Sequence, residues 1–345
     1  MAESHPPKRR RVQDPEHGQS TSAKPSTPCT RGDLWLDDGN VILVAQDGTG
    51  FRVHRSVLTA NSEIFRDMFM IPQPEDAEKW DGCDVVRLPE TRKDLGHLLN
   101  VLFNVGNSLL SYGQRIPFEI ASVMIRLGSK YHIEYLRADA IKRLKELFPP
   151  TLDAFVNWWI DGKSRGLTDA RYPFPSKAIL MAHRDCIEML NIAQTHQLDA
   201  MLPPIFYMVS LLENEVIIGN DTDYGSEETQ SRTLSRETLV KIFNGHHRLR
   251  RQGVEQEELI LRALPGPSCK TYDLCARASK DSDMRILHLA SLYRMTNVLS
   301  APTTVNVCDK CAKHYMAEWK DQRLKAWKDL AHTFELKTEW PIKSN

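Results

Sequence analysis

Four cysteines in the C-terminal part of the chain are the residues whose type and spacing suggest chemistry most directly. Cys308 and Cys311 are separated by two residues, a spacing that lets one turn hold two thiolates on the same metal ion. Cys269 and Cys275 are separated by five residues and could complete a tetrahedral set of thiolates. We therefore expect one structural zinc at these four cysteines, because four thiolates leave no open position for water or substrate.

Other interpretations of these cysteines stay open. His288 or His314 could replace one of the Cys269 and Cys275 thiolates, since imidazole also binds zinc. All four could instead be ordinary reduced thiols in a helical domain. A redox pair is disfavoured, because no strand–helix–strand pattern of the thioredoxin type surrounds the closely spaced pair. The chain has seven cysteines, an odd number, so we expect a reducing intracellular compartment and no disulfide framework.

Residues typical of catalytic sites occur only in incomplete sets. Gly48–Val53 and His183–Asp185 imitate two elements of protein kinases, but Leu190 occupies the place where the metal-binding Asn belongs. His54 closes an apolar strand with no partner group near it in the sequence, so we interpret it as a core histidine. No nucleophile–base pair, phosphate loop or carboxylate pair is recognisable. We predict that the chain is not an enzyme.

The composition is that of a globular protein without a strong overall charge. Lys plus Arg and Asp plus Glu each total 45, and 41% of the 345 residues are hydrophobic. A neutral chain has no global field that attracts phosphate backbones or anionic lipids. No apolar run approaches the roughly 20 residues that a membrane-spanning helix needs. We therefore expect neither sequence-specific nucleic-acid binding nor membrane association.

Residues 1–31 differ from the rest of the chain because they are rich in Pro, Ser, Thr and charge. Such a segment buries too little apolar surface to offset its ordering entropy, so we predict a disordered tail. Within it, Lys8, Arg9, Arg10 and Arg11 follow two prolines and are similar to a monopartite nuclear import signal. This predicts an import carrier as a partner and the nucleus as the location, with the cytoplasm as the alternative.

From residue 32 to about 148 the pattern predicts a small sheet flanked by helices. Two β-rich runs, 41–45 and 51–54, surround an Asp-Gly turn and indicate a hairpin, and 84–88 indicates a further strand. Helices are expected as two short segments over 57–69, the second capped by Asn61 or Ser62, and then at 95–103, from Pro117 to 127, and at 133–147.

Residues 149–345 are expected to form a mainly helical C-terminal domain. An acidic stretch at 219–231 predicts an exposed loop that interrupts it. The helices are expected near 152–163, 177–197, 203–213, 234–250, 255–264, 282–297 and 310–335. The predicted fold class is therefore an α+β domain followed by a mainly α-helical domain.

The run from Phe51 to Phe69 resembles the signature of the BTB/POZ family. A strand at 85–88, a Leu-rich helix at 94–104 and the sequence Gly128–Tyr131 follow in the order of that family. The opening Asp33–Asn40 looks most like the large fungal set of such proteins. The residues that match the signature are Phe51, His54, Arg55, Leu58, Ser62, Phe65, Met68 and Phe69.

The resemblance implies a protein-interaction domain at 32–148, with self-association among its interactions. We predict a non-catalytic adaptor, acting as a nuclear co-regulator in transcription regulation; the alternative is a substrate adaptor of a cullin-type ubiquitin ligase. Two features depart from the family. The polar tail occupies the place of the amphipathic helix found in stable swapped dimers. The loop 71–82 contains no convincing apolar-x-Glu element of the kind that binds cullins.

Overall fold

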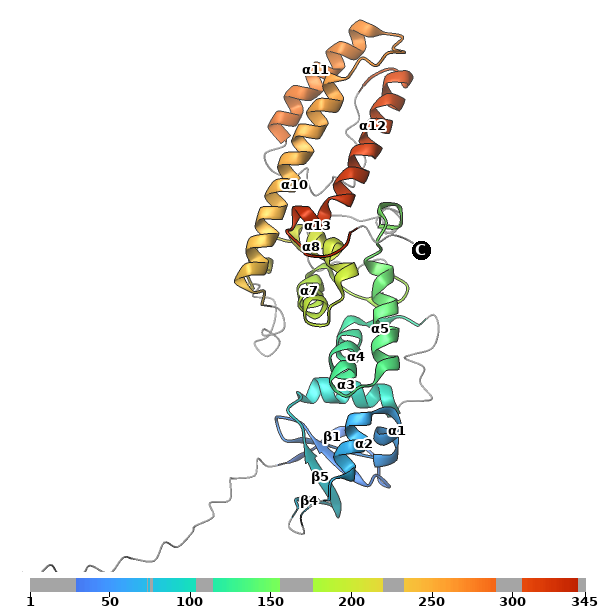
Figure 1. Cartoon of the computed structure of the whole chain (residues 1–345), viewed down its shortest axis with the longest axis vertical. Helices are drawn as coiled ribbons and strands as arrows, with labels where there is room; N and C mark the ends of the chain where they lie inside the picture. Colours follow the sequence, from blue (N-terminus) through green and yellow to red (C-terminus); the bar gives the residue numbers. More distant parts are fainter. Residues whose placement is uncertain are drawn as a thin grey trace, which may run out of the picture.

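The chain is described by a computed structural model over residues 29–72, 74, 77–103, 114–155, 176–219, 233–289 and 306–340. Side chains are not described for Val254, Glu257 and residues 281–289. The basic run Lys8–Arg11 and nearly all of the acidic stretch 219–231 lie outside these ranges. The molecule is elongated, with a sheet at one end and three long helices at the other (Figure 1).

A five-stranded mixed sheet forms the first end of the molecule. The predicted hairpin is present, with β2 and β3 antiparallel around a turn in which Gly48 has a φ of 89°. β1 runs parallel to β3 and begins at Thr30, inside the segment expected to be a tail. The spatial order is β1 (Thr30–Trp35), β3 (Thr49–Val53), β2 (Val41–Val44), β5 (Cys83–Arg87) and β4 (Lys79–Trp80).

The face of the sheet turned away from the helices is covered by two tryptophans. Ile42 and Val44 on this face are fully buried, and Trp35 and Trp80 pack against them with ring centroids 5.0 Å apart. Gly50 makes this possible, because a Cβ there would lie 2.3 Å from the Trp80 ring. Both faces of the short sheet are therefore shielded from water.

Five helices follow in the predicted order and pack on the other face of the sheet or on one another. The second is capped by Ser62, one of the two expected capping residues. The fourth starts at Phe118, so Pro117 precedes the helix instead of opening it. The helices are α1 (Arg55–Asn61), α2 (Glu63–Met70), α3 (Arg92–Phe103), α4 (Phe118–Lys130) and α5 (Glu134–Leu147).

The connection to the C-terminal region differs from the helix expected at 177–197. β7 (Ile179–Leu180) pairs in parallel with β6 (Ile116–Pro117), and a 3-10 turn (His183–Asp185) leads into α7 (Cys186–Thr195). The periodicity was misleading because Ile179 is buried as a strand residue beside Ile116. A second turn (Asp199–Met201), α8 (Leu202–Ser210) and α9 (Asn214–Ile217) follow.

The far end of the molecule is an arm made of α10 (Arg236–Arg262), α11 (Tyr272–Leu289) and α12 (Asp309–Lys328), as Figure 1 shows. α13 (Leu330–Thr333) is the last described helix and lies beside α8 and α10. Two helices predicted at 234–250 and 255–264 are one continuous helix, so the predicted break was wrong. The helix expected near 282–297 begins earlier, at Tyr272.

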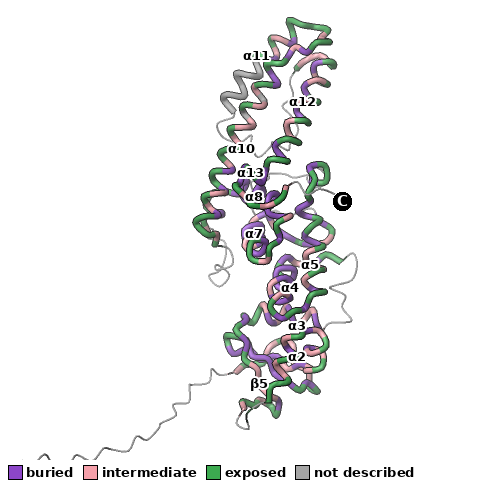
Figure 2. The backbone as a smooth tube through the Cα atoms, in the orientation of Figure 1, coloured by how far each residue is buried: buried purple, intermediate pink, exposed green. Residues whose placement is uncertain are grey.

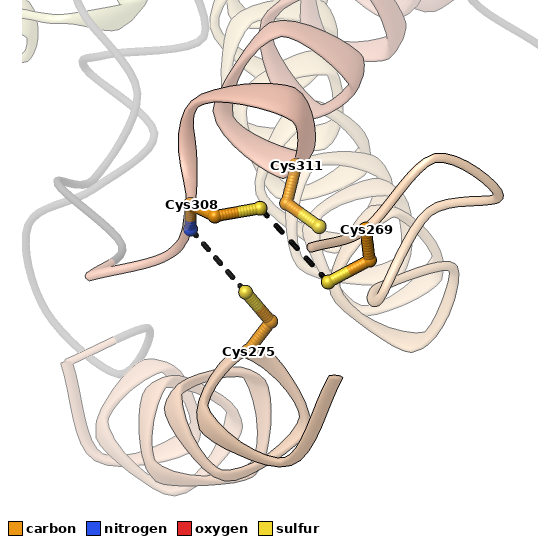
Figure 3. Close-up of side chains that lie close together, drawn as sticks. All are labelled: Cys269, Cys275, Cys308 and Cys311. Carbon is orange, nitrogen blue, oxygen red and sulfur yellow. Dashed lines mark hydrogen bonds between the residues drawn. The ribbon is translucent and has the colours of Figure 1, made fainter. Parts of the chain in front are cut away.

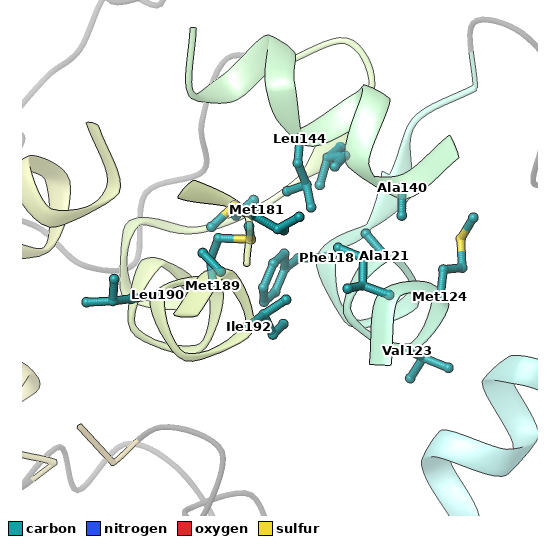
Figure 4. Close-up of a cluster of buried hydrophobic side chains, with 14 of the residues drawn as sticks. Phe118, Ala121, Val123, Met124, Ala140, Leu144, Met181, Met189, Leu190 and Ile192 are labelled. Carbon is teal, nitrogen blue, oxygen red and sulfur yellow. The ribbon is translucent and has the colours of Figure 1, made fainter. Parts of the chain in front are cut away.

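The buried side chains fall into one large core and two small ones. The main core runs without interruption from the sheet through α4, α5, α7 and α8 to Phe334 near the end of the chain. Figure 2 shows buried positions along this whole path. Figure 4 shows its centre, where Phe118 of α4 lies between Ala121 of its own helix and Met189 and Ile192 of α7.

The tip of the arm has a separate core. α10 and α12 contribute to both cores, since Ile242 and Trp327 belong to the main core while Ile260 and Trp319 belong to the tip. None of the helices that the structure describes has the length and apolarity needed to cross a membrane.

Candidate functional site

The four cysteines of the sequence prediction come from two connections in the arm. Cys269 lies in the turn between α10 and α11, and Cys275 lies in the first turn of α11. Cys308 is the N-cap of α12, with φ −65° and ψ 158°, and Cys311 lies in the first turn of that helix. Two helix starts and one loop therefore direct thiols to the same point (Figure 3).

The sulfur atoms are close enough to share a metal ion. All four lie within 4.8 Å of one another, and the Sγ atoms of Cys269 and Cys308 are 3.9 Å apart. A tetrahedral ion with bonds of about 2.3 Å to sulfur places its ligands roughly 3.8 Å apart. The cysteine cluster thus has the donor set and nearly the spacing of a tetrathiolate site.

Two of the thiols are poised to lose their protons. Backbone N–H groups of Lys270 and Cys311 lower the pKa of the Cys308 thiol to about 6. The N–H of Cys308 donates to the Sγ of Cys275 at 3.2 Å and lowers the pKa of that thiol too. Hydrogen bonds from backbone amides favour the charged form of the group that accepts them.

The other two thiols are shifted in the opposite direction by burial. Desolvation raises the pKa of Cys311 to about 12, and it raises the pKa of Cys269 as well. Backbone N–H groups of Gly266 and Thr271 act against these shifts. A cation at the centre would reverse the effect of burial, because a metal-coordinated thiol is deprotonated.

Three lysines lie close to the clustered cysteines in the sequence. Lys270 follows Cys269 directly, and Lys310 and Lys313 lie on either side of Cys311 on α12. All three are exposed. Four thiolates around a divalent ion carry a net charge of −2, so nearby cations lower the cost of holding that charge at the protein surface.

Of the two histidines considered as replacement ligands, only His314 has a described side chain, and it is not one of the clustered residues. The side chain of His288 lies outside the described residues. The ring of His314 packs near Gly266, where a Cβ would lie 3.1 Å from it. The four-cysteine interpretation is therefore the one that the geometry favours.

The family-signature residues form the joint between the sheet and the first helices. Ser62 is buried, accepts the N–H of Phe65 at 3.1 Å and donates to the carbonyl of Tyr131 at 2.6 Å. The Phe65 ring stacks on the Tyr131 ring at 4.6 Å. Phe51 and Leu58 are buried in the same core, and Met68 packs against it.

The two charged members of the signature lie at the edge of this joint. Arg55 contacts Asp84 at 2.8 Å and lies over the Phe69 ring at 4.8 Å. His54 is not a core residue as expected, since its side chain is 30% exposed and lies 3.3 Å from Asp38. His54 directly follows the last residue of β3, where the strand reaches the surface, so water reaches its ring.

A polar network that the sequence did not reveal joins the sheet end to α7. Arg126 donates to both carboxylate oxygens of Asp94 at 2.8 and 3.0 Å and to Ser122, and Ser122 donates to Glu188 at 2.6 Å. The network borders an open cleft of about 1030 Å³. Ser122 and Arg126 are one turn apart on α4, but Asp94 and Glu188 are 32 and 66 residues away from their partners, so the fold brings these carboxylates to the pair.

Comparison with known proteins identifies one domain. The family model described as "BTB/POZ domain" matches residues 37–146, and no curated protein matches the chain. The match covers most of the sheet and helices α1–α5 and includes every residue of the predicted signature. It does not address origin, so the likeness to the fungal set stays a prediction. Residues 37–146 of this chain are thus a BTB/POZ domain, a protein-interaction domain, and a mainly helical region follows it.

Proposed function

We propose that this protein is a non-catalytic adaptor that binds its partners through the BTB/POZ domain and acts in the nucleus as a co-regulator. The family match at residues 37–146 carries the proposal, because BTB/POZ domains mediate protein binding and dimerisation. Residues 1–31 would supply nuclear import, 32–148 partner binding, and 149–345 a helical support. Self-association is tested by measuring the molar mass of the purified chain in solution at several concentrations.

In this proposal, the basic run Lys8–Arg11 directs the protein into the nucleus. Changing these four residues to Ala in a fusion with a large fluorescent protein should move the fusion from the nucleus to the cytoplasm. A large partner is needed because the 39.5 kDa chain alone is small enough to leak through nuclear pores. Unchanged nuclear accumulation of the variant would contradict the proposal.

A cullin-ligase adaptor is the alternative that the same domain allows. The loop before β5 offers little for it among its described residues, because Glu78 pairs with Arg87 at 2.7 Å and Trp80 packs on Gly50. The two functions are separated by purifying the tagged protein from cells and probing for a cullin. Recovery of a cullin that depends on the BTB/POZ domain would favour the alternative, and its absence would favour the co-regulator.

We further propose that Cys269, Cys275, Cys308 and Cys311 hold one structural zinc ion. The support is the set of sulfur distances, the amide hydrogen bonds to the thiols and the exposed lysines beside them. Zinc bound by four thiolates would supply a cross-link between α11 and α12 and no catalysis. Zinc would bind the folded arm and not the unfolded one. The free energy of zinc binding would therefore add to the free energy of unfolding of the arm.

Elemental analysis of protein purified without added metal tests the zinc proposal. We expect close to one zinc per chain and close to none in a Cys308→Ser, Cys311→Ser variant. Cys29→Ser is the control, since this cysteine is only partly buried and lies outside the cluster. Wild-type protein without zinc would contradict the proposal, and iron in place of zinc would change the identity of the metal.

A further inference from the structure

The turn between α10 and α11 wraps the cysteine cluster with hydrogen-bond donors. Residues 266–271 supply backbone N–H groups to the sulfurs of Cys269, Cys308 and Cys311. Amide donors of this kind depend on the path of the main chain and not on side-chain identity. Substitution of the residues around them would therefore change these three contacts little.

The sulfur of Cys275 is held differently. Besides the N–H of Cys308 at 3.2 Å, its neighbour is the hydroxyl of Thr271, with 3.4 Å between Oγ1 and Sγ. Cys275 is fully buried, so its sulfur has no access to water. A thiolate has no proton to give, and the Thr271 hydroxyl must be the donor when the sulfur is charged.

We propose that Thr271 is a positioning residue of the metal site, whose hydroxyl orients Cys275 as a ligand; this rests on the proposed zinc. Groups that hydrogen-bond to metal ligands fix the orientation of the ligand and tune its basicity, and their loss typically weakens metal binding about 10- to 100-fold. Thr271 is placed for this role because its Oγ1 lies 3.4 Å from the Sγ of Cys275, and the role can be tested because substitution removes this hydroxyl without altering the backbone amides of the turn.

A purely structural role for Thr271 is the competing explanation. Its carbonyl accepts the N–H of Cys275 at 3.0 Å, so Thr271 is the residue that caps α11. A Thr at this position commonly accepts a backbone N–H with its hydroxyl, which stabilises the helix whether or not a metal is present. A positioning role predicts that removing the hydroxyl changes the bond between the metal and the Cys275 sulfur. A capping role predicts that this bond stays the same.

Zinc affinity of the full chain, measured by competition with a chromophoric chelator, tests the role of Thr271. Thr271→Val keeps the shape and removes the donor, and we expect its zinc affinity to fall about 10- to 100-fold. Thr271→Ser keeps the donor and should bind zinc within a few-fold of wild type. Ser268→Ala in the same turn is the control, because Ser268 is exposed and is not one of the residues of the cluster.

Cobalt loading supplies a readout that helix capping alone would not change. The lost hydrogen bond would make the Cys275 sulfur more electron-rich, so the sulfur-to-cobalt charge-transfer absorption of Thr271→Val should move to longer wavelength. Unchanged absorption and unchanged zinc affinity in this variant would overturn the role of Thr271 while leaving the zinc proposal intact. A wild-type chain that binds neither metal would overturn both.

Discussion

At the scale of single residues, a few buried polar groups have more than one hydrogen-bonding role. Ser62 caps α2 through the N–H of Phe65 and also donates to the carbonyl of Tyr131, which lies 69 residues further along the chain. One hydroxyl therefore joins the start of α2 to the end of α4. This explains why a small polar residue sits at 1% exposure between apolar neighbours.

Ser62→Ala should lower the free energy of unfolding of the whole chain by about 2–3 kcal/mol, as the loss of a helix cap and an unsatisfied buried carbonyl together imply. Denaturant titration followed by fluorescence measures the change. Ser56→Ala on the exposed side of α1 is the control and should change stability by less than about 0.5 kcal/mol. Equal stabilities of the two variants would show that the Tyr131 carbonyl finds another donor.

Residue types and spacing were sufficient to predict some of these contacts. Ser62 was recognisable as a cap, and the Cys308–Cys311 pair predicted that a turn would present two thiols. The donors to the sulfurs were not predictable, because they are backbone N–H groups whose direction depends on the main-chain path from Gly266 to Thr271. The spacing of the cysteines was thus enough to predict which thiols come together, whereas the hydrogen-bond donors around them depend on the fold.

At the scale of elements, helix α10 is longer than local propensity suggests. Two helices were predicted, at 234–250 and 255–264, and Gly253, a poor helix former, lies in the gap between them. The helix continues because both of its halves are buried, with Leu249 in the main core and Ile260 in the tip core. At 177–197 a continuous helix was predicted, but the structure has a strand at its start. Ile179 pairs with Ile116 there, although the apolar spacing of the segment is helical.

α10 and the end of α13 can pack closely because residue 245 of α10 is a glycine. A Cβ on Gly245 would lie 2.1 Å from the buried Phe334 ring, closer than atoms can approach. Gly245→Ala gains about 1 kcal/mol of helix propensity but costs roughly 3 kcal/mol through overpacking, so we expect a net loss of stability.

Thermal and denaturant unfolding of Gly245→Ala measure this balance. The loss should shrink when Phe334→Leu is added, because the smaller side chain makes room for the new methyl group. An Ala variant that is more stable than wild type in both backgrounds would mean that α13 moves away without cost.

At the scale of the whole molecule, the tip of the arm has a core of its own, separate from the main core, so we expect the tip and the body to differ in stability. The tip core contains few large side chains besides Tyr315 and Trp319, and its centre is the cysteine cluster. The main core extends from Val41 to Phe334 and contains no residue of that cluster. Because α10 and α12 reach into both cores, each is anchored at one end even when the tip is loosened.

If the proposed zinc is bound, its removal by a chelator should therefore loosen the tip and leave the body folded. Hydrogen exchange followed by mass spectrometry should show faster exchange at residues 258–280 and 306–320 after chelation, with α4 and α5 unchanged. Restoring zinc should restore protection. Faster exchange throughout α4 and α5 would contradict the separation of the two cores.

The BTB/POZ domain is not expected to be stable by itself, because its apolar surface continues into the C-terminal region. Phe118 faces Met189 and Ile192 of α7, Leu144 lies beside Met181, and β6 pairs with β7. A fragment of residues 29–148 would expose these side chains to water at about 25 cal/mol per Å² of apolar surface.

We expect the 29–148 fragment to unfold at a clearly lower temperature than the full chain and to bind an apolar dye. A fragment of residues 29–219, which keeps α7 and α8 against α4, should recover part of the lost stability. Circular dichroism during heating compares the three proteins. If the short fragment unfolds as late as the full chain without binding dye, the boundary near residue 148 divides independent domains, and the continuous core contributes little to the stability of the BTB/POZ domain.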